Sequence, residues 1–444
     1  MKISSILGLN ARSQLYLSKN MKAGKKIADS KIATFRVMKA SEVPTPQIYK
    51  KFRNPKDIFD FNWESLPNAF ALKPSRGLGG EGIVVVKKRS ADKTGWITTG
   101  RIKVTSEDLK LHILDILEGA YSIGNVPDVA FVQEYVGRHN AFRKYSYRGT
   151  PDIRVIVFNK VPVMAMLRLP TKESGGRANL FQGAIAAGID IATGITTRAI
   201  WHGDIIKYKP ETNRKLNGIK IPNWTQVLET AVRGSIAANL NYAGIDIVLH
   251  PEKGPMILEL NAQPGLKIQL ANMAGLKKRL ERVEDLNVRD AEHGVKIAKA
   301  LFAERFTDRV AAEEGIKKIS VWEEIKIIKK DKTTFPVFAK IDTGAWRTSV
   351  DKDLAEELGL LKKENILWNR KVRTSNGTQE RPVVNLSFYL AGRKVKTTGS
   401  ITKRSHLRVP MIIGRRDLVG FMVSSTYQDR PASWVPPMWK SRKT

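Results

Sequence analysis

The segment GIDIVLHPEKGPMILELN, residues 244–261, constrains the fold most, because it is typical of two apolar strands joined by a tight polar turn. A turn centred in the middle of HPEKGP pairs Asp246 with Glu259 across an antiparallel ladder. Residues that face each other in such a ladder have Cβ atoms about 4.5–5.5 Å apart. Asn261 shares the face of Glu259, since alternate residues of a strand point the same way. The hairpin therefore predicts a sheet in which two carboxylates and an amide oxygen converge.

Two carboxylates this close repel each other, and a cation between them removes that cost. Asp246, Glu259 and Asn261 offer only oxygen donors, which suit Mg²⁺ bound together with nucleotide phosphates. The alternative is an exposed hairpin that carries two unrelated acids. We expect these three residues to be metal ligands, with Mn²⁺ as a substitute for Mg²⁺.

A glycine-rich loop, RGLGGEG at residues 76–82, lies between two short β-rich runs. Glycines let backbone N–H groups approach phosphates closely. The loop matches neither the P-loop nor the dinucleotide-binding pattern, so an ordinary turn is the alternative. Lys73, on the strand that enters the loop, favours phosphate binding because it supplies a point charge. The candidate phosphate contacts in the loop are Gly77, Gly79, Gly80 and Gly82.

The organisation of the chain changes near residue 316. Up to about residue 285, strands alternate with helical stretches and glycine loops. Residues 286–315 are charged and helical, and we expect them to form a bridge. Residues 316–444 contain short strands, polar turns and a single helical run, which predicts a separate, mostly β domain.

The net charge of +33 indicates a polyanionic partner. Nucleic acid, the ribosome and an acidic polypeptide all fit, while the alternative is that the lysines only decorate solvated faces. The chain has no cysteine, which excludes disulfides and thiolate zinc sites. Its apolar runs fall short of the roughly 20 residues of a spanning helix, and its first residues make a poor signal peptide. We expect a cytoplasmic protein without a membrane span.

Seven strings occur in the order found in ATP-grasp ligases, so the resemblance is specific although each string is weak alone. They are ALKPSRGLGGEGIVVV, VQEYV, PDIRVIV, VMAMLRLPT, RANLFQGA, GIDIVL and LELNAQPGLKIQLAN. Residues 1–285 resemble most closely the alpha-L-glutamate ligase-related, RimK-like branch. The resemblance implies an α+β ATP-grasp fold, in which two α+β lobes grip ATP.

The resemblance also implies roles for single residues. Arg154 and Arg168 would steady the phosphates and an acyl phosphate during catalysis. The hairpin residues discussed above match magnesium ligands. One departure is Gln263, in NAQPG, where the family pattern has NARPG, and it leaves the substrate open. The residues matched to nucleotide contacts are Lys31 and Lys73 at the phosphates, Glu134 and Tyr135 at the hinge that holds adenine and ribose, and Asp152, Arg177 and Asn179.

The reaction implied by the resemblance is amide formation. ATP phosphorylates a carboxylate, and an amine attacks the resulting acyl phosphate. The expected amine is glutamate or a similar amino acid, and the expected acceptor is a carboxylate of a peptide or protein. One alternative is a polyanion-binding protein with a degenerate ATP-grasp lobe, against which the intact Lys73, Asp246, Glu259 and Asn261 argue. Another is a dimeric aspartic-type protease with an ATP-dependent regulatory domain.

The β domain carries Asp-Thr-Gly in AKIDTGAWRTSV and, later, IIGRRDL. It resembles the retropepsin-like ATP-dependent zinc protease family, which implies Asp342 as a catalytic carboxylate. An aspartic mechanism needs two carboxylates that share a proton, so one such turn per chain requires a homodimer. Zinc is not supported, because the domain has no cysteine and only His406. The alternative, an inert binding or dimerisation module, is the one we favour.

Overall fold

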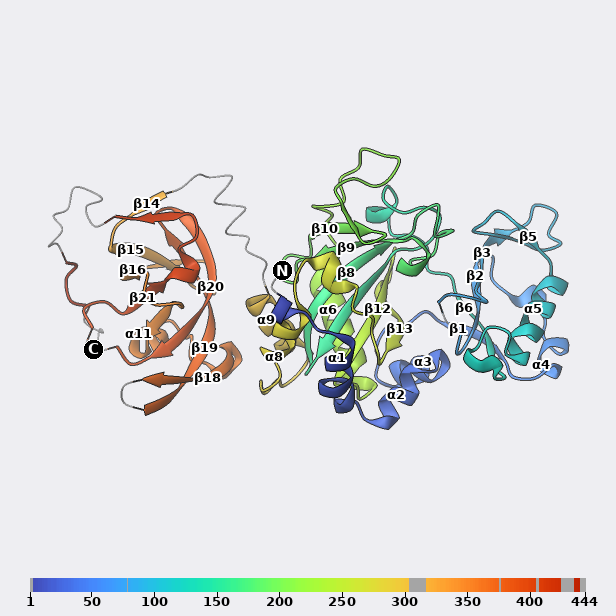
Figure 1. The fold of residues 1–444 in the computed structure, drawn as a ribbon, viewed down its shortest axis with the longest axis horizontal. Helices are drawn as coiled ribbons and strands as arrows, with labels where there is room; N and C mark the ends of the chain where they lie inside the picture. The colour runs from blue at the N-terminus through green and yellow to red at the C-terminus, as the bar shows by residue number, and fades with distance from the viewer. Residues whose placement is uncertain are drawn as a thin grey trace. The chain divides into compact units, whose positions relative to one another are not determined.

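The computed structural model describes residues 3–77, 79–302, 317–374, 377–404, 407–424 and 435–439. The chain separates into two compact units, Met1–Phe302 and Ala303–Thr444, whose elements are labelled in Figure 1. The first unit combines helices with two antiparallel sheets, and the second is rich in strands. In the described part of the chain, no helix has the length and apolar character that crossing a bilayer requires.

The smaller sheet of the first unit has the strand order β1-β6-β2-β3-β4-β5. Helix α5 (Ser106–Glu118) packs against β6, begins with a capping box between Thr105 and Asp108, and ends at Gly119 in the left-handed conformation. Its buried side chains join those of the sheet in one apolar core. The strands are β1 (Ile48–Phe52), β2 (Phe70–Pro74), β3 (Val84–Arg89), β4 (Trp96–Thr98), β5 (Lys103–Val104) and β6 (Ala130–Glu134); α4 (Lys56–Phe59) lies beside β1.

The larger sheet of the first unit has the order β11-β10-β9-β8-β7-β12-β13. In its centre, both alternating sets of side chains are buried, so both faces of the sheet are covered. This explains the long apolar runs that the sequence shows here. The strands are β7 (Asp152–Phe158), β8 (Val161–Leu169), β9 (Ile185–Ile189), β10 (Thr196–Trp201), β11 (Asp204–Ile206), β12 (Tyr242–His250) and β13 (Gly254–Asn261).

Further helices cover the larger sheet and complete the described part of the first unit. Helix α6 (Trp224–Ala237) packs on β12 and β13, and α9 (Ala291–Leu301) packs on α6 and β8. Residues 286–302, part of the predicted bridge, therefore lie within the first unit, and residues 303–315 lie outside the described residues. The others are α1 (Leu9–Leu15), α2 (Lys22–Ala28), α3 (Lys31–Ala40), α7 (Ile268–Asn272) and α8 (Leu276–Glu281).

The second unit holds a sheet with the order β15-β16-β21-β17-β20-β19-β18, in which β15 also pairs with β19, so that the sheet curls back on itself. Apolar side chains from these strands form its core. The sheet-rich architecture agrees with the predicted mostly β domain, and the retropepsin-like topology stays a prediction. The elements are β14 (Lys317–Ile319), β15 (Trp322–Ile328), β16 (Thr334–Asp342), β17 (Ser349–Asp351), α11 (Lys352–Glu357), β18 (Ile366–Thr374), β19 (Gly377–Leu390), β20 (Arg393–Thr402), β21 (Met411–Gly414) and β22 (Phe421–Val423).

Candidate active site

The β12–β13 hairpin aligns Asp246 with Glu259, as predicted. The turn itself differs from the prediction, because His250 pairs with Gly254 and the turn is centred on Glu252. Leu258 then has no partner across the ladder, and this bulge restores the predicted alignment beyond it.

Four charged side chains on adjacent strands form a cluster around Asp246. Arg154 donates from Nε to Asp246 Oδ1 and from Nη2 to Oδ2, each at 2.6 Å. Arg168 donates from Nη2 to Asp246 Oδ2 at 2.6 Å and to Asp152 Oδ2 at 2.7 Å, and its Nε also bonds Asp152. The strand pairing places Asp152 opposite Arg168 and Asp246 opposite Arg154, so the ladder itself aligns the ion pairs.

The two aspartates of this cluster differ in their proton affinity. Burial alone would raise the pKa of Asp246, but two guanidinium groups outweigh it and hold that pKa below its ordinary value. Asp152 is hydrogen-bonded to Arg168, and burial, with a contribution from the charge of Asp246, raises its pKa to about 6. Burial would lower the pKa of Arg168, yet the two carboxylates raise it instead. Asp246 thus keeps its charge to a lower pH than Asp152, which suits the proposed role as a metal ligand.

The oxygen atoms left over at this site fit a hard cation. A carboxylate has about four acceptor positions, and the arginines use three of those on Asp246, which leaves one on Oδ1. Glu259 makes no hydrogen bond among the described residues, and Asn261 Oδ1 accepts one from the Gln263 N–H at 2.9 Å. The described residues contain no group of three histidine, aspartate or glutamate side chains that could hold a metal ion. A metal site with three protein ligands at this position therefore needs the amide oxygen of Asn261.

Two lysines converge beside Glu259. Lys31, the first residue of α3, has Nζ 3.7 Å from Glu259 Oε1 and donates to the Gly77 carbonyl at 3.1 Å. Lys73 is buried on β2 and donates to Gln133 Oε1 at 2.8 Å. Burial, with a smaller contribution from the charge of Lys31, lowers the pKa of Lys73 to about 8, and Glu259 partly opposes the shift. Two ammonium groups share one carboxylate, so the position favours an added anion.

The glycine loop needs its glycines for conformational reasons. Gly79, Gly80 and Gly82 have φ of 62°, 83° and 66°, where other residues are strained. A Cβ at Gly82 would also lie 2.5 Å from the Tyr121 ring. Gly77 forms a bridge with Ser122, and Leu78 lies outside the described residues.

The predicted contact loop of Arg177 and Asn179 meets the glycine loop. Asn179 donates from Nδ2 to the Gly79 carbonyl at 3.0 Å. A Cβ at Gly80 would lie 3.9 Å from Arg177 Cδ, an ordinary contact. The structure therefore brings together two loops that lie about a hundred residues apart in the chain.

The hinge residues are engaged with protein groups. Glu134 accepts from the Gln47 N–H at 3.0 Å, and Lys253 donates to its other oxygen. Burial would raise the pKa of Glu134, but these two donors outweigh it and lower that pKa. Burial raises the pKa of Tyr135. Each oxygen of the Glu134 carboxylate thus has a protein donor, so its position at the hinge is fixed by Gln47 and Lys253.

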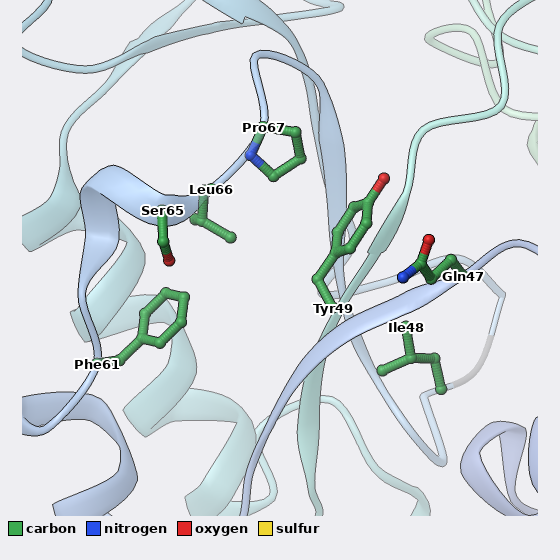
Figure 2. A pocket seen from close by; sticks show the side chains of 7 residues that line it. All are labelled: Gln47, Ile48, Tyr49, Phe61, Ser65, Leu66 and Pro67. Carbon is green, nitrogen blue, oxygen red and sulfur yellow. The ribbon is translucent and has the colours of Figure 1, made fainter.

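Figure 2 shows a surface cavity of about 390 Å³ beside β1, with Tyr49 and Phe61 on facing sides. None of the predicted site residues lines it, and it holds no cluster of charged groups. Gln47, whose N–H bonds Glu134, connects its wall to the hinge. We therefore place the chemistry at the lysines and the β12–β13 hairpin rather than in this cavity.

Gln133 is a site residue that the sequence patterns did not single out as functional. Its side chain is fully buried and holds Lys73. The signal in the sequence was a lone amide inside the apolar run AFVQEYV, since a buried polar side chain requires a partner.

In the second unit, Asp342 closes a local turn. Its Oδ1 accepts from the Gly344 N–H at 3.0 Å and from the Ala345 N–H at 3.1 Å. This is the geometry of an Asx turn, in which a side chain caps backbone donors two and three residues ahead. The described contacts of Asp342 support a structural role.

Residues 10–285 match the sequence family described as sugar-transfer associated ATP-grasp. A probable alpha-L-glutamate ligase of Xanthomonas euvesicatoria pv. vesicatoria is 23% identical over 214 residues, which are 48% of this chain and 50% of that protein. The chain thus spans about half the length of this curated relative.

Two solved structures resemble the chain at lower sequence identity. The ATP-grasp ligase PsnB, complexed with a variant of its minimal precursor, Mg and ADP, is 14% identical, covering 60% of this chain and 62% of its own, with a TM-score of 0.34. A RimK domain ATP-grasp protein of Sphaerobacter thermophilus is 10% identical. The match covers 59% of this chain and 69% of that protein, also with a TM-score of 0.34.

Proposed function

Because this chain belongs to the sugar-transfer associated ATP-grasp family, we propose that it uses ATP to join a carboxylate to an amine. Family membership supports the predicted ATP-grasp fold of the first unit, with ATP and Mg²⁺ as cofactors. The finer assignment, addition of glutamate or a similar amino acid to a peptide or protein, rests on the sequence resemblance and on the name of the Xanthomonas relative. The cytoplasmic location expected from the sequence stays part of this proposal.

The observation that carries this proposal is the pair of lysines beside Glu259. Lys73 is buried, its hydrogen-bond partner among the described residues is an uncharged amide, and Lys31 lies close enough to disfavour its charge further. A triphosphate would supply the missing negative charge, and the adjacent glycine loop would supply backbone N–H groups. Mg²⁺, when bound by Asp246, Glu259 and Asn261, would neutralise phosphate charge.

The two arginines have a double role in this proposal. Arg154 holds Asp246 through Nε and Nη2, while Arg168 holds Asp246 through Nη2 and Asp152 through Nε. Nη1 of each guanidinium makes no hydrogen bond among the described residues, so it remains available to a phosphate. The acceptor carboxylate would attack the γ-phosphorus with release of ADP, and the amine would then displace phosphate from the acyl phosphate. Positioning and charge neutralisation suffice for both steps.

The test is release of ADP and phosphate by the full chain with a panel of amino acids, acidic peptides and, given the description of the family, amino sugars. We expect release that depends on both an amine and a carboxylate acceptor, with an amide product detected by mass spectrometry. ATP hydrolysis that no amine stimulates would contradict the ligase assignment.

The same panel separates the alternatives. Peptide cleavage without ATP would support the dimeric protease, in which Asp342 acts as a catalytic carboxylate. Polyanion binding without turnover would support the degenerate lobe. For the second unit we propose a retropepsin-like domain that serves docking or dimerisation, and the turn geometry of Asp342 supports a role without catalysis.

A further inference from the structure

Phe181 is the most exposed large apolar side chain of the described residues, with 84% of its surface accessible. It lies in a short 3-10 helix, Leu180–Gln182, that is anchored on both sides. Asn179 accepts from the Phe181 N–H at 2.9 Å and donates to Gly79, while the Gly183 carbonyl accepts from Thr171 Oγ1 and Trp201 Nε1. Hydrogen bonds on both sides therefore hold this segment in a position in which the Phe181 ring faces solvent.

The Phe181 ring contacts a cation from another loop. Lys267 Nζ lies 3.8 Å from the ring centroid, within the range of a cation–π contact. Lys267 precedes α7 and follows the metal-ligand candidate Asn261 by six positions in the chain. The contact thus joins the loop that meets the glycine loop to the loop that leaves the β12–β13 hairpin.

We name as the basic rim the Phe181–Lys267 pair together with Arg177, which precedes Phe181 by four positions in the same loop and lies beside Gly80. Arg177 and Lys267 are exposed and make no ion pair with any described residue. Glu173, an acid of the same loop as Arg177, is already bonded to His202 at 2.8 Å. The rim therefore presents two unneutralised cations and one aromatic ring next to the candidate phosphate loop.

We propose that the basic rim is the docking surface for the acceptor, an acidic peptide segment that places carboxylates on Arg177 and Lys267 and an apolar side chain against Phe181. This inference rests on the proposed function, since the reaction requires a carboxylate to enter beside the phosphates. The lysine already covers one face of the single aromatic ring of the rim. That arrangement suits a peptide side chain better than a stack of bases, which needs free ring faces.

The test measures binding by the full chain of a fluorescently labelled, glutamate-rich peptide with one central phenylalanine. The variants are Phe181→Ala and Lys267→Ala. The matched controls are Phe59→Ala, which removes another exposed ring (74% accessible), and Lys278→Ala, which removes an exposed lysine of α8. Nucleotide affinity and melting temperature are measured for each variant, so that a misfolded protein is recognised.

We expect each rim variant to raise the peptide Kd about twofold to fivefold, the range for losing one cation–π contact or charge pair at a surface. The control variants should leave the Kd unchanged, and nucleotide affinity should stay constant throughout. Equal peptide affinity in rim and control variants would overturn the proposal. So would an RNA oligonucleotide of equal charge that binds more tightly and depends on the same two residues.

Different experimental outcomes would overturn this inference and the ligase proposal. Rim-dependent peptide binding without any amine-stimulated ATP turnover would support the docking surface and contradict the ligase. Turnover with a peptide acceptor whose KM in both rim variants equals that of the wild type would support the ligase and overturn the docking surface.

Discussion

Lys73 and Gln133 lie diagonally opposite each other on β2 and β6, and the Lys73 ammonium donates to the Gln133 side-chain oxygen at 2.8 Å. Both side chains are buried. An amide accepts the hydrogen bond but carries no charge to neutralise the ammonium. Burial therefore lowers the pKa of Lys73 to about 8, with Lys31 adding to the shift and Glu259 opposing it.

The depressed pKa of Lys73 predicts a specific dependence of stability on pH. Between pH 8 and 10.5 the unfolded chain binds more protons than the folded one, so the free energy of unfolding due to Lys73 rises with pH. Relative to Lys73→Met, the wild type should gain about 3 kcal/mol over this range. Urea unfolding of both proteins at several pH values measures this difference in the free energy of unfolding. Lys278→Met is the control, and a pH-independent difference for Lys73→Met would refute the shift.

Replacing Gln133 tests whether its uncharged side chain keeps the pKa of Lys73 low. ATP affinity of the wild type should fall above pH 8, as Lys73 loses its proton. In Gln133→Glu, a carboxylate beside the ammonium raises the pKa of Lys73, so the fall should move up by about one pH unit or more. Calorimetric titration with ATP across pH 7 to 10 gives both midpoints. The exposed control Gln14→Glu should keep the wild-type midpoint, and an unmoved midpoint in Gln133→Glu would argue against the coupling.

Removing the charge of Glu259 and removing that of Asp246 should have different effects on stability. Glu259→Gln removes a half-exposed carboxylate whose side chain makes one long ion pair, to Lys31, and no hydrogen bond among the described residues, so turnover should be lost while the unfolding free energy falls by about 1 kcal/mol or less. Asp246→Asn leaves Arg154 without a carboxylate and Arg168 with Asp152 alone, which should cost about 3–5 kcal/mol in addition to activity. Thermal unfolding and ADP release measure both effects. Wild-type turnover in either variant would exclude that residue from the site.

The net charge of +33 predicts a salt effect on the acceptor. Screening shortens the reach of surface charge to about 8 Å at 0.15 M salt. The KM for an acidic acceptor should therefore rise steeply between low and physiological salt, while the KM for ATP changes less. Steady-state kinetics at several salt concentrations separate the two. An acceptor KM that does not respond to salt would mean that the lysines only solvate the surface.

Asp342→Asn should be nearly neutral, because asparagine also caps an Asx turn. Asp342→Ala should lower the stability of the full chain by about 1 kcal/mol through loss of the cap. Neither variant should change ligation, and no peptide cleavage is expected from the wild type. A peptide library assayed with all three proteins is the measurement. Cleavage that Asp342→Asn removes would show a catalytic aspartate and hence the protease alternative.

The β12–β13 hairpin shows how far sequence reasoning reaches. Alternation and turn residues predicted both strands and the pairing of Asp246 with Glu259. The predicted centre of the turn was wrong by half a residue, and the unpaired Leu258 compensates for the difference. A bulge depends on how the strand packs against its neighbours, so local patterns do not contain it.

The ion-pair cluster lies beyond such reasoning. Each of its residues was predicted as a site residue, but their mutual pairing depends on β7 joining β12, some ninety residues further along the chain. The same holds for Lys267 and Phe181, which come from loops about as far apart. Which acid stays charged then depends on how many arginines reach it, and only the assembled sheet fixes that number.

Residue letters were enough to predict the local elements, the ATP-grasp family and a set of residues whose chemistry suits phosphate and metal. These properties depend on side-chain chemistry and on spacing along a strand, both of which are readable from the chain. The environment of each residue follows only from the fold: the buried, uncompensated charge of Lys73, the engaged carboxylate of Glu134 and the anchored exposure of Phe181. Burial and electrostatic coupling depend on distances between strands remote in sequence, and those distances exist only in the folded chain.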